Sequence, residues 1–222
     1  MNHCPDNDIF NVQWADPGSN IHKQATCQME VFNYAFRKLH AYGVEWVMNF
    51  DVDEFVWTPA NGILLPEMLA SKDHFYPYDV VTIHGMTFGH NGFEDAASHA
   101  GGLVIEQYTK RSALAKLKWS VYDQDRYIKK ILFRPGSIYF AYVHDVKSWF
   151  GRETNVPPLS AHLRMNHYKF LSKAEQHEKS LANWNPEVDV QPERDALMNQ
   201  VVDTEIMYLL PQVKAMLQSL NV

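Results

Sequence analysis

Trp46-Val47-Met48-Asn49-Phe50-Asp51-Val52-Asp53-Glu54-Phe55 is the stretch from which the fold and function of this chain are best predicted. Its apolar, β-branched and aromatic residues indicate a buried strand that ends in two carboxylates. Side chains two apart on a strand share a face, so Asp51 and Asp53 are expected to point the same way and to repel unless a cation or donors lie between them. Ligands of α/β sheets bind beyond the carboxyl ends of strands. The stretch therefore predicts a divalent metal site that also holds a phosphorylated substrate.

The residues alone leave three other interpretations of Asp51 and Asp53 open. Surface acids after a strand are the ordinary alternative, although the apolar residues on both sides keep this segment close to the core. A calcium loop of the EF-hand type would need a central glycine and a closing glutamate, which the stretch lacks. In a phosphatase the first aspartate attacks phosphate and the second protonates the leaving group, but Glu54-Phe55 departs from the small or β-branched residue expected there.

The composition is that of a globular protein, with 46% hydrophobic and 21% charged residues among 222. The net charge of −6 argues against a nucleic-acid-binding face. No apolar run approaches the ~20 residues of a membrane span, and the N-terminus lacks the layout of a secretory signal, so we expect a cytoplasmic chain without a membrane span.

Cys4 and Cys27 are too few for a disulfide framework or a zinc cluster, and a single disulfide bridge between them stays open.

A β-α-β unit is expected at the start of the chain. Residues 9–14 alternate as in a short strand. An amphipathic helix follows, with Gly43 as its stop signal. Its apolar positions recur at helical spacing at Ala25, Met29, Phe32, Phe36 and Leu39. A strand on each side of this helix favours a parallel pair in an α/β sheet.

More strands are predicted downstream, at residues 79–84, 103–108, 127–133 and 137–143. The last two are separated by Arg134-Pro135-Gly136, a tight connection that favours a hairpin. The segment 85–102 is rich in glycine and histidine, and it is too long to be idle in a compact domain.

Helices are expected in the C-terminal third and at one earlier position. Pro66 opens a short helix. Ser172 and Glu175 form the capping-box pattern of a helix over 174–184. Pro211 divides or kinks a final helical segment over 193–220.

Several blocks of sequence resemble one family of enzymes. The stretch 46–55 is similar to a segment in which an apolar strand ends in Asp-Val-Asp-Glu-Phe. The blocks that follow in the same order are Phe88-Gly89 with Gly102-Leu103-Val104-Ile105-Glu106, Lys129-Lys130-Ile131 with Arg134-Pro135 and His144, and Leu163-Arg164-Met165-Asn166-His167-Tyr168. From about Asp6 to Trp184 the chain resembles the GT-A glycosyltransferases, specifically the family 92 and family 2-like group with its DxD motif.

The resemblance implies an α/β fold, a GT-A-like mixed sheet flanked by helices with a helical C-terminal end. It also implies an enzyme, a metal-dependent glycosyltransferase. The reaction would move a sugar from a nucleotide-diphosphate donor, by resemblance a UDP-sugar, to a hydroxyl of a carbohydrate or glycoconjugate acceptor. Mn²⁺ or Mg²⁺ would bridge the two phosphates of the donor and neutralise the charge of the departing diphosphate.

Asp53 is the metal ligand that the resemblance favours, with Asp51 reaching the ribose or, through water, the metal. His144 or His167 would complete the metal or substrate site, and an imidazole suits Mn²⁺ better than Mg²⁺. A structural histidine is an equal alternative for His144, and a turn cap is one for His167.

Lys129, Lys130 and Arg134 are candidates for contacts with phosphate, and an ordinary surface charge is an equal alternative for each. An inverting transferase also needs a base near the reacting sugar carbon. The available acids are Glu94, Asp95 and Glu106, and solvated loop acids are the alternative interpretation of each.

Members of this family carry a further strand and helix before the point that corresponds to Met1. We therefore expect residues 1–185 to be an N-terminally truncated catalytic domain and residues 186–222 a helical extension; full-length relatives could be membrane-anchored. Two other functions stay open. One is a phosphohydrolase that uses Asp51 and Asp53, and the other is a degenerate transferase fragment that binds carbohydrate or nucleotide without turnover.

Overall fold

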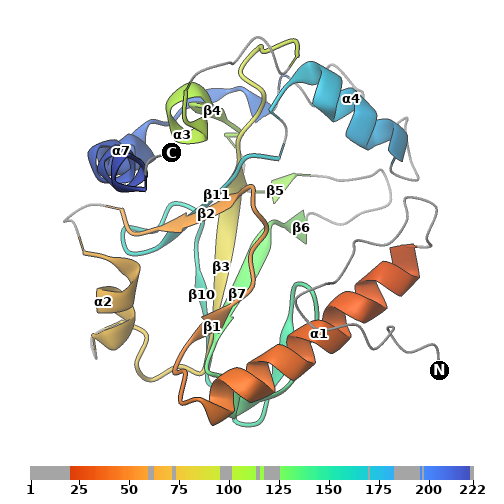
Figure 1. The fold of residues 1–222 in the computed structure, drawn as a ribbon, viewed down its shortest axis with the longest axis vertical. Coiled ribbons are helices and arrows are strands. Elements are labelled where there is room, and N and C mark those ends of the chain that lie inside the picture. Colours follow the sequence, from red (N-terminus) through yellow and green to blue (C-terminus); the bar gives the residue numbers. More distant parts are fainter. Residues whose placement is uncertain are drawn as a thin grey trace. The chain divides into compact units, whose positions relative to one another are not determined.

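The computed structural model describes most of the chain (Figure 1). The described residues are 21–59, 63–71, 74–95, 102–113, 116–117, 126–169, 171–182, 196 and 198–220, without the side chains of 21–26, 116–117, 126–127, 176 and 179–182. The chain divides into two units. The first unit comprises Met1–Asn49, Met68–Thr82 and Lys130–Asn155, and the second comprises Phe50–Glu67, Ile83–Lys129 and Val156–Val222.

The first unit contains the long helix α1 (Ile21–Ala41), as the apolar spacing predicts. The helix ends where the backbone N–H of Gly43 donates to the carbonyl of His40 and that of Val44 donates to Leu39, both at 3.0 Å. Gly43 has a φ of 75°. Only glycine adopts this left-handed conformation without strain, so the predicted stop signal is confirmed.

The strands of the first unit form two groups. The first group is part of one sheet and contains β1 (Val47–Met48), the first part of β3 (Val80–Thr87), and most of β7 (Lys129–Phe133) and β10 (Glu153–Val156). The second group is the hairpin of β8 (Ile138–Ala141) and β9 (Val146–Ser148). β1 pairs with β7 antiparallel, with Val47 opposite Phe133. β7 is followed in the sheet by β3, with which β10 also pairs.

The hairpin expected between residues 127–133 and 137–143 is wrong. β8 pairs with β9 instead, and the short 3-10 helix η2 (Pro135–Ser137) separates it from β7. Pro135 has no N–H for a strand ladder and suits the first turn of a helix. The backbone N–H of Ser137 closes this turn on the carbonyl of Arg134 at 3.0 Å.

The core of the first unit lies between α1 and these strands. Its buried residues are Phe36, Val80, Ile131, Phe133, Ile138, Ala141 and Val146, with Phe32 and Val47 packed against them. Phe36 and Phe133 meet edge to face, with ring centroids 6.2 Å apart. Cys27, on α1, is disulfide-bonded.

The second unit is built on three neighbouring strands in the order β3-β11-β2. β11 (Arg164–His167) runs antiparallel to β2 (Glu54–Trp57) and parallel to β3. The sheet is therefore mixed, and β3 and β11 form a parallel pair within it. Two small pairs accompany it, formed by β4 (Lys110–Arg111) with β12 (Val201–Val202) and by β5 (Lys116–Leu117) with β6 (Arg126–Tyr127).

The helical elements of the second unit are α3 (Val104–Gln107), α4 (Lys173–Ala182), the 3-10 helix η3 (Glu205–Leu209) and α7 (Leu210–Ser219); α2 (Leu65–Ala70) crosses the boundary between the units. The strand expected over 103–108 is wrong, because α3 begins there, and the carboxylate of Glu106 accepts a hydrogen bond from the backbone N–H of Leu103 at its start. Pro211 lies in the first turn of α7, so it opens this helix and does not kink a longer one.

A second core lies in this unit. Its buried residues are Trp57, Met86, Phe88, Ile105, Tyr108, Tyr168 and Ile206. Both units mix helices and strands, so the chain is an α/β protein with a mixed sheet and a C-terminal helix, as expected in outline. The strand expected at 9–14, Cys4 and the domain boundary expected at 185 lie outside the described residues. None of the helices in the described part of the chain is long and apolar enough to cross a membrane.

Candidate functional site

Asp51 and Asp53 lie in a tight turn and not on an extended strand. The backbone N–H of Glu54 donates to the carbonyl of Asp51 at 3.1 Å, and strand structure resumes at Glu54. Phe50 is 58% exposed, so the buried strand expected up to that residue is wrong. The physical reason is that Asn and Asp side chains compete with the strand ladder for backbone hydrogen bonds and favour turns. The expected alternation of faces therefore does not apply to this pair.

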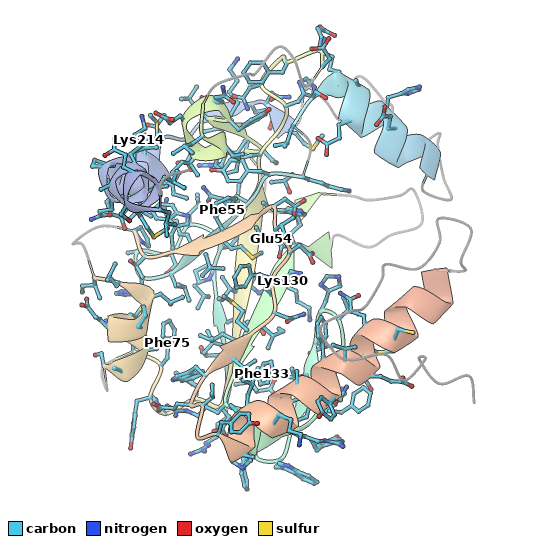
Figure 2. The ribbon with its side chains drawn as sticks, in the orientation of Figure 1. Glu54, Phe55, Phe75, Lys130, Phe133 and Lys214 are labelled. Carbon is cyan, nitrogen blue, oxygen red and sulfur yellow. The ribbon has the colours of Figure 1, made fainter. Side chains whose placement is uncertain are left out.

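The side chain of Glu54 stabilises this turn by a hydrogen bond to its backbone. Its carboxylate is buried, and Oε2 accepts a hydrogen bond from the backbone N–H of Asp51 at 3.0 Å. Together with the bond from its own N–H, this closes a ring of two hydrogen bonds across the turn. Figure 2 shows Glu54 and Phe55 as neighbours at the beginning of β2. Glu54 was not among the expected site residues; the signal that could have found it is an acid at the first position of an apolar strand.

His167 lies beside this turn at the end of β11. The register places it opposite Glu54 on β2 and opposite Thr87 on β3, and side chains at paired positions share one face of a sheet. Its Nε2 lies 3.5 Å from Oδ2 of Asp53. The backbone N–H of Tyr168 donates to the carbonyl of Asp53 at 2.8 Å and so fixes the turn against β11. The structure thus brings Asp51, Asp53 and His167 together.

Two polar atoms on this face have no hydrogen-bond partner among the residues that the structure describes. They are Nδ1 of His167 and Oγ1 of Thr87, and both are buried. Buried polar atoms in folded proteins are nearly always hydrogen-bonded, to protein or to ordered water. The unmet hydrogen-bonding capacity of these neighbouring side chains indicates a position for water or for a polar ligand.

The distance between Asp53 and His167 fits two ligands of one cation. At 3.5 Å the two atoms are too far apart for a good hydrogen bond. Two protein ligands that bind one ion at about 2.1 Å and about 90–110° apart lie roughly 3.0–3.5 Å from each other. Within the described residues, no group of three or more His, Cys, Asp or Glu side chains could hold a metal ion. Among the described residues the site therefore offers a pair of potential ligands, Asp53 and His167.

Three of the expected site residues belong to the first unit and not to this one. His144 lies in the exposed connection between β8 and β9, where the backbone N–H of Tyr142 donates to the carbonyl of Asp145 at 2.7 Å. Lys130 is only 2% exposed, so it is not a surface charge. Arg134 is the third of these residues. Lys129 is half-buried and belongs to the second unit.

Arg134 is held by its own unit on several sides. Its guanidinium lies 4.3 Å above the ring of Trp46 and 5.8 Å above that of Tyr76. Nη1 pairs with Glu45, and Nε donates to the carbonyl of Tyr78 at 3.3 Å. These contacts describe a guanidinium that joins segments of the fold, which is a structural role.

The candidate bases are all in the second unit, and two of them form ion pairs. Glu94 is exposed and accepts a hydrogen bond from Lys173 at 2.6 Å. Glu106 pairs with Lys214 of α7, which Figure 2 labels, and caps the first turn of α3 through the N–H of Leu103. The hydrogen bond from Lys214, then that from Leu103, lowers the pKa of Glu106 below its ordinary value. A carboxylate with a lowered pKa is a weaker base.

Asp95 is exposed at the edge of the described residues. The comparisons with known proteins add no further constraint: no family model and no curated protein matches this chain.

Proposed function

We propose that this chain is a metal-dependent glycosyltransferase that binds the diphosphate of a nucleotide sugar at the turn Asp51–Glu54 and His167. The observation that carries the proposal is the 3.5 Å separation of Asp53 Oδ2 and His167 Nε2, a distance typical of two ligands of one cation. The order of the sequence blocks that resemble the GT-A family supports it. The donor class is a UDP-sugar, and the acceptor is a hydroxyl of a carbohydrate or glycoconjugate.

Each residue of this turn has a distinct part in the proposal. Asp53 and His167 are the protein ligands, and Asp51, which is exposed, reaches the ribose or a metal-bound water. Glu54 does not touch the ligand; through its hydrogen bond to the N–H of Asp51 it keeps the turn closed. When bound, Mn²⁺ or Mg²⁺ neutralises the charge that collects on the departing diphosphate.

The register explains why β11 is needed for such a site. His167 follows Asn166, whose Oδ1 accepts a hydrogen bond from the indole of Trp57 at 3.1 Å. It precedes Tyr168, which lies 5.4 Å from the ring of Phe55. Both flanking side chains are tied to β2, so the imidazole is held in place beside Asp53. A preorganised ligand pair loses little conformational freedom when it binds.

Calorimetric titration with UDP tests the proposal. The wild-type chain is expected to bind UDP in Mn²⁺ and to lose this binding when the metal is removed. Asp53→Ala is expected to abolish the metal-dependent part, whereas Glu30→Ala, which removes an exposed acid on α1, serves as the matched control. Absence of UDP binding by the wild-type chain in Mn²⁺ contradicts the proposal.

Turnover is a separate question with its own measurement. Hydrolysis of a UDP-sugar without added acceptor would show a working enzyme and exclude a transferase fragment that only binds. Release of phosphate from a simple phosphomonoester, with no UDP binding, would favour the phosphohydrolase that Asp51 and Asp53 also permit.

A further inference from the structure

The first unit carries a hollow that the proposed transferase function does not use. It has a volume of about 310 Å³ and lies among α1, η2, β8 and the segment after β9. The residues that matter for its chemistry are Phe36, Arg37, His40, Gly136, Tyr139 and Trp149. Its volume is at the lower end of the range of about 300–1,000 Å³ that small-molecule sites occupy.

One wall of this pocket is an exposed pair of aromatic rings. Trp149 is 65% exposed and Tyr139 is 45% exposed. Their ring centroids lie 4.7 Å apart, with an angle of 47° between the planes. Large apolar rings gain free energy when they leave water, so two of them held together in the open mark a surface that a ligand can cover.

Two nitrogen-bearing side chains from α1 also line the hollow. Arg37 and His40 are three residues apart, so they lie on one face of the helix. The imidazole of His40 packs directly on the backbone of Gly136, where an added Cβ would lie only 2.7 Å from its Cε1. Gly136 thus lets His40 approach the turn and line the pocket. None of the residues that line the hollow is acidic, in a chain whose net charge is −6.

We propose that this pocket binds a saccharide unit that carries an anionic group, such as a carboxylate. A sugar ring has an apolar C–H face, which packs on Trp149 and Tyr139, and hydroxyl edges, which His40 can bond. The guanidinium of Arg37 supplies the planar, bidentate partner that a carboxylate prefers. A folded protein partner would need about 800 Å² of contact on each side, whereas the pocket accommodates one or two sugar rings. The site is independent of the metal and of the nucleotide.

Saturation-transfer NMR with D-glucuronate and D-glucose tests this assignment without metal or nucleotide. The two probes share the ring and differ in the carboxylate. Glucuronate is expected to bind at least threefold more tightly than glucose, because an exposed ion pair contributes up to about one factor of five. Equal binding of the two sugars, or no binding of either, overturns the proposal.

Matched variants locate the binding. Trp149→Ala is expected to weaken glucuronate at least tenfold, and Arg37→Gln is expected to remove the preference for glucuronate while glucose binding persists. Tyr42→Ala removes another exposed aromatic ring of the same unit, outside the pocket, and should change neither. Asp53→Ala should also leave glucuronate binding intact, which separates this site from the proposed transferase site. Circular dichroism of each variant checks the fold, and an unchanged affinity in folded Trp149→Ala refutes the assignment.

Discussion

Asp53 and Asp79 stand at equivalent places in the two units, each directly before a strand, and their surroundings are opposite. Asp79 is completely buried: Oδ1 accepts hydrogen bonds from Ser137 at 2.9 Å and from Arg152 at 2.7 Å, and Oδ2 accepts another from Arg152 at 2.7 Å. The side chain of Asp53 is 30% exposed, and Oδ2 faces His167 at 3.5 Å.

The comparison shows how to separate structural acids from acids that bind. The hydrogen bond and charge of Asp79 raise the pKa of Arg152. The two side chains form an ion pair that joins segments of the first unit. Asp53 instead keeps a solvent-accessible face and a neighbour at the distance of a second ligand. Both aspartates directly precede a strand, so their different roles follow from the groups that their carboxylates contact.

The largest expected effect is on ligand binding at Asp53. Asp53→Asn keeps the size of the side chain and removes its charge, so metal-dependent binding of UDP should weaken at least 100-fold, about 2.7 kcal/mol. The free energy of unfolding should change by no more than about 0.5 kcal/mol, because the residue is partly exposed. Mn²⁺ titration followed by electron paramagnetic resonance, together with urea unfolding, measures both. A loss of stability without a loss of affinity would assign Asp53 the same role as Asp79.

The reverse pattern is expected at Asp79. Asp79→Ala removes a fully hydrogen-bonded buried carboxylate and leaves the hydroxyl of Ser137 buried without this partner, so the free energy of unfolding should fall by about 2–3 kcal/mol. Urea unfolding is the measurement. An unchanged midpoint would contradict the structural role, and Ser148→Ala, whose exposed hydroxyl bonds Glu153 at 2.8 Å, is the control with a small expected effect.

A smaller effect is expected at Glu54, which supports the turn without touching the ligand. Glu54→Ala removes the acceptor of the Asp51 N–H, and the looser turn should weaken metal-dependent UDP binding about tenfold. Glu54→Gln retains an acceptor oxygen and should keep most of the affinity. Calorimetry on the two variants is the test. If the glutamine variant were as weak as the alanine variant, the charge of Glu54 and not its hydrogen bond would be what the site needs.

The smallest effect concerns Glu106, an acid between these two extremes. Its pKa is lowered by Lys214 and Leu103, so its contribution to stability is present above its ordinary pKa of 4.5 and is lost as the pH falls through the folded value. Lys214→Met should raise the pKa of Glu106 towards that ordinary value. An NMR titration of the Glu106 carboxyl carbon measures it, and an unchanged midpoint would rule out the ion pair as the main cause.

The fold was predictable where local signals agree with packing. The helix at 21–41 has both an apolar stripe and a glycine stop. Of the capping box expected from Ser172 and Glu175, one half forms: the N–H of Glu175 donates to Oγ of Ser172 at 3.1 Å, whereas the carboxylate of Glu175 accepts the N–H of Leu171 at 2.7 Å. The strand expected at 103–108 failed because its apolar residues are as compatible with a short helix, and the carboxylate of Glu106 accepts the N–H of Leu103 at the start of that helix. Strand pairing was not predictable, since the partners of β8 and β11 depend on long-range contacts.

The proximity of the expected residues was predictable only in part. The structure places Asp51 and Asp53 in one turn and His167 Nε2 3.5 Å from Asp53 Oδ2. The turn conformation and the buried Glu54 were not predicted, because a sequence does not show which competing hydrogen bonds win. Lys130 looked like one charge among several on a strand, yet it is buried.

The contacts of Arg134 have a consequence for reading the relatives of this chain. A planar guanidinium can lie flat on Trp46 while its edge bonds Glu45 and Tyr78, and a lysine ammonium cannot do both. Substitution by lysine should therefore be rare at this position during evolution, even in relatives with no activity. Packing alone would thus account for an arginine that never changes at residue 134, so such invariance should not by itself be counted as a sign of catalysis.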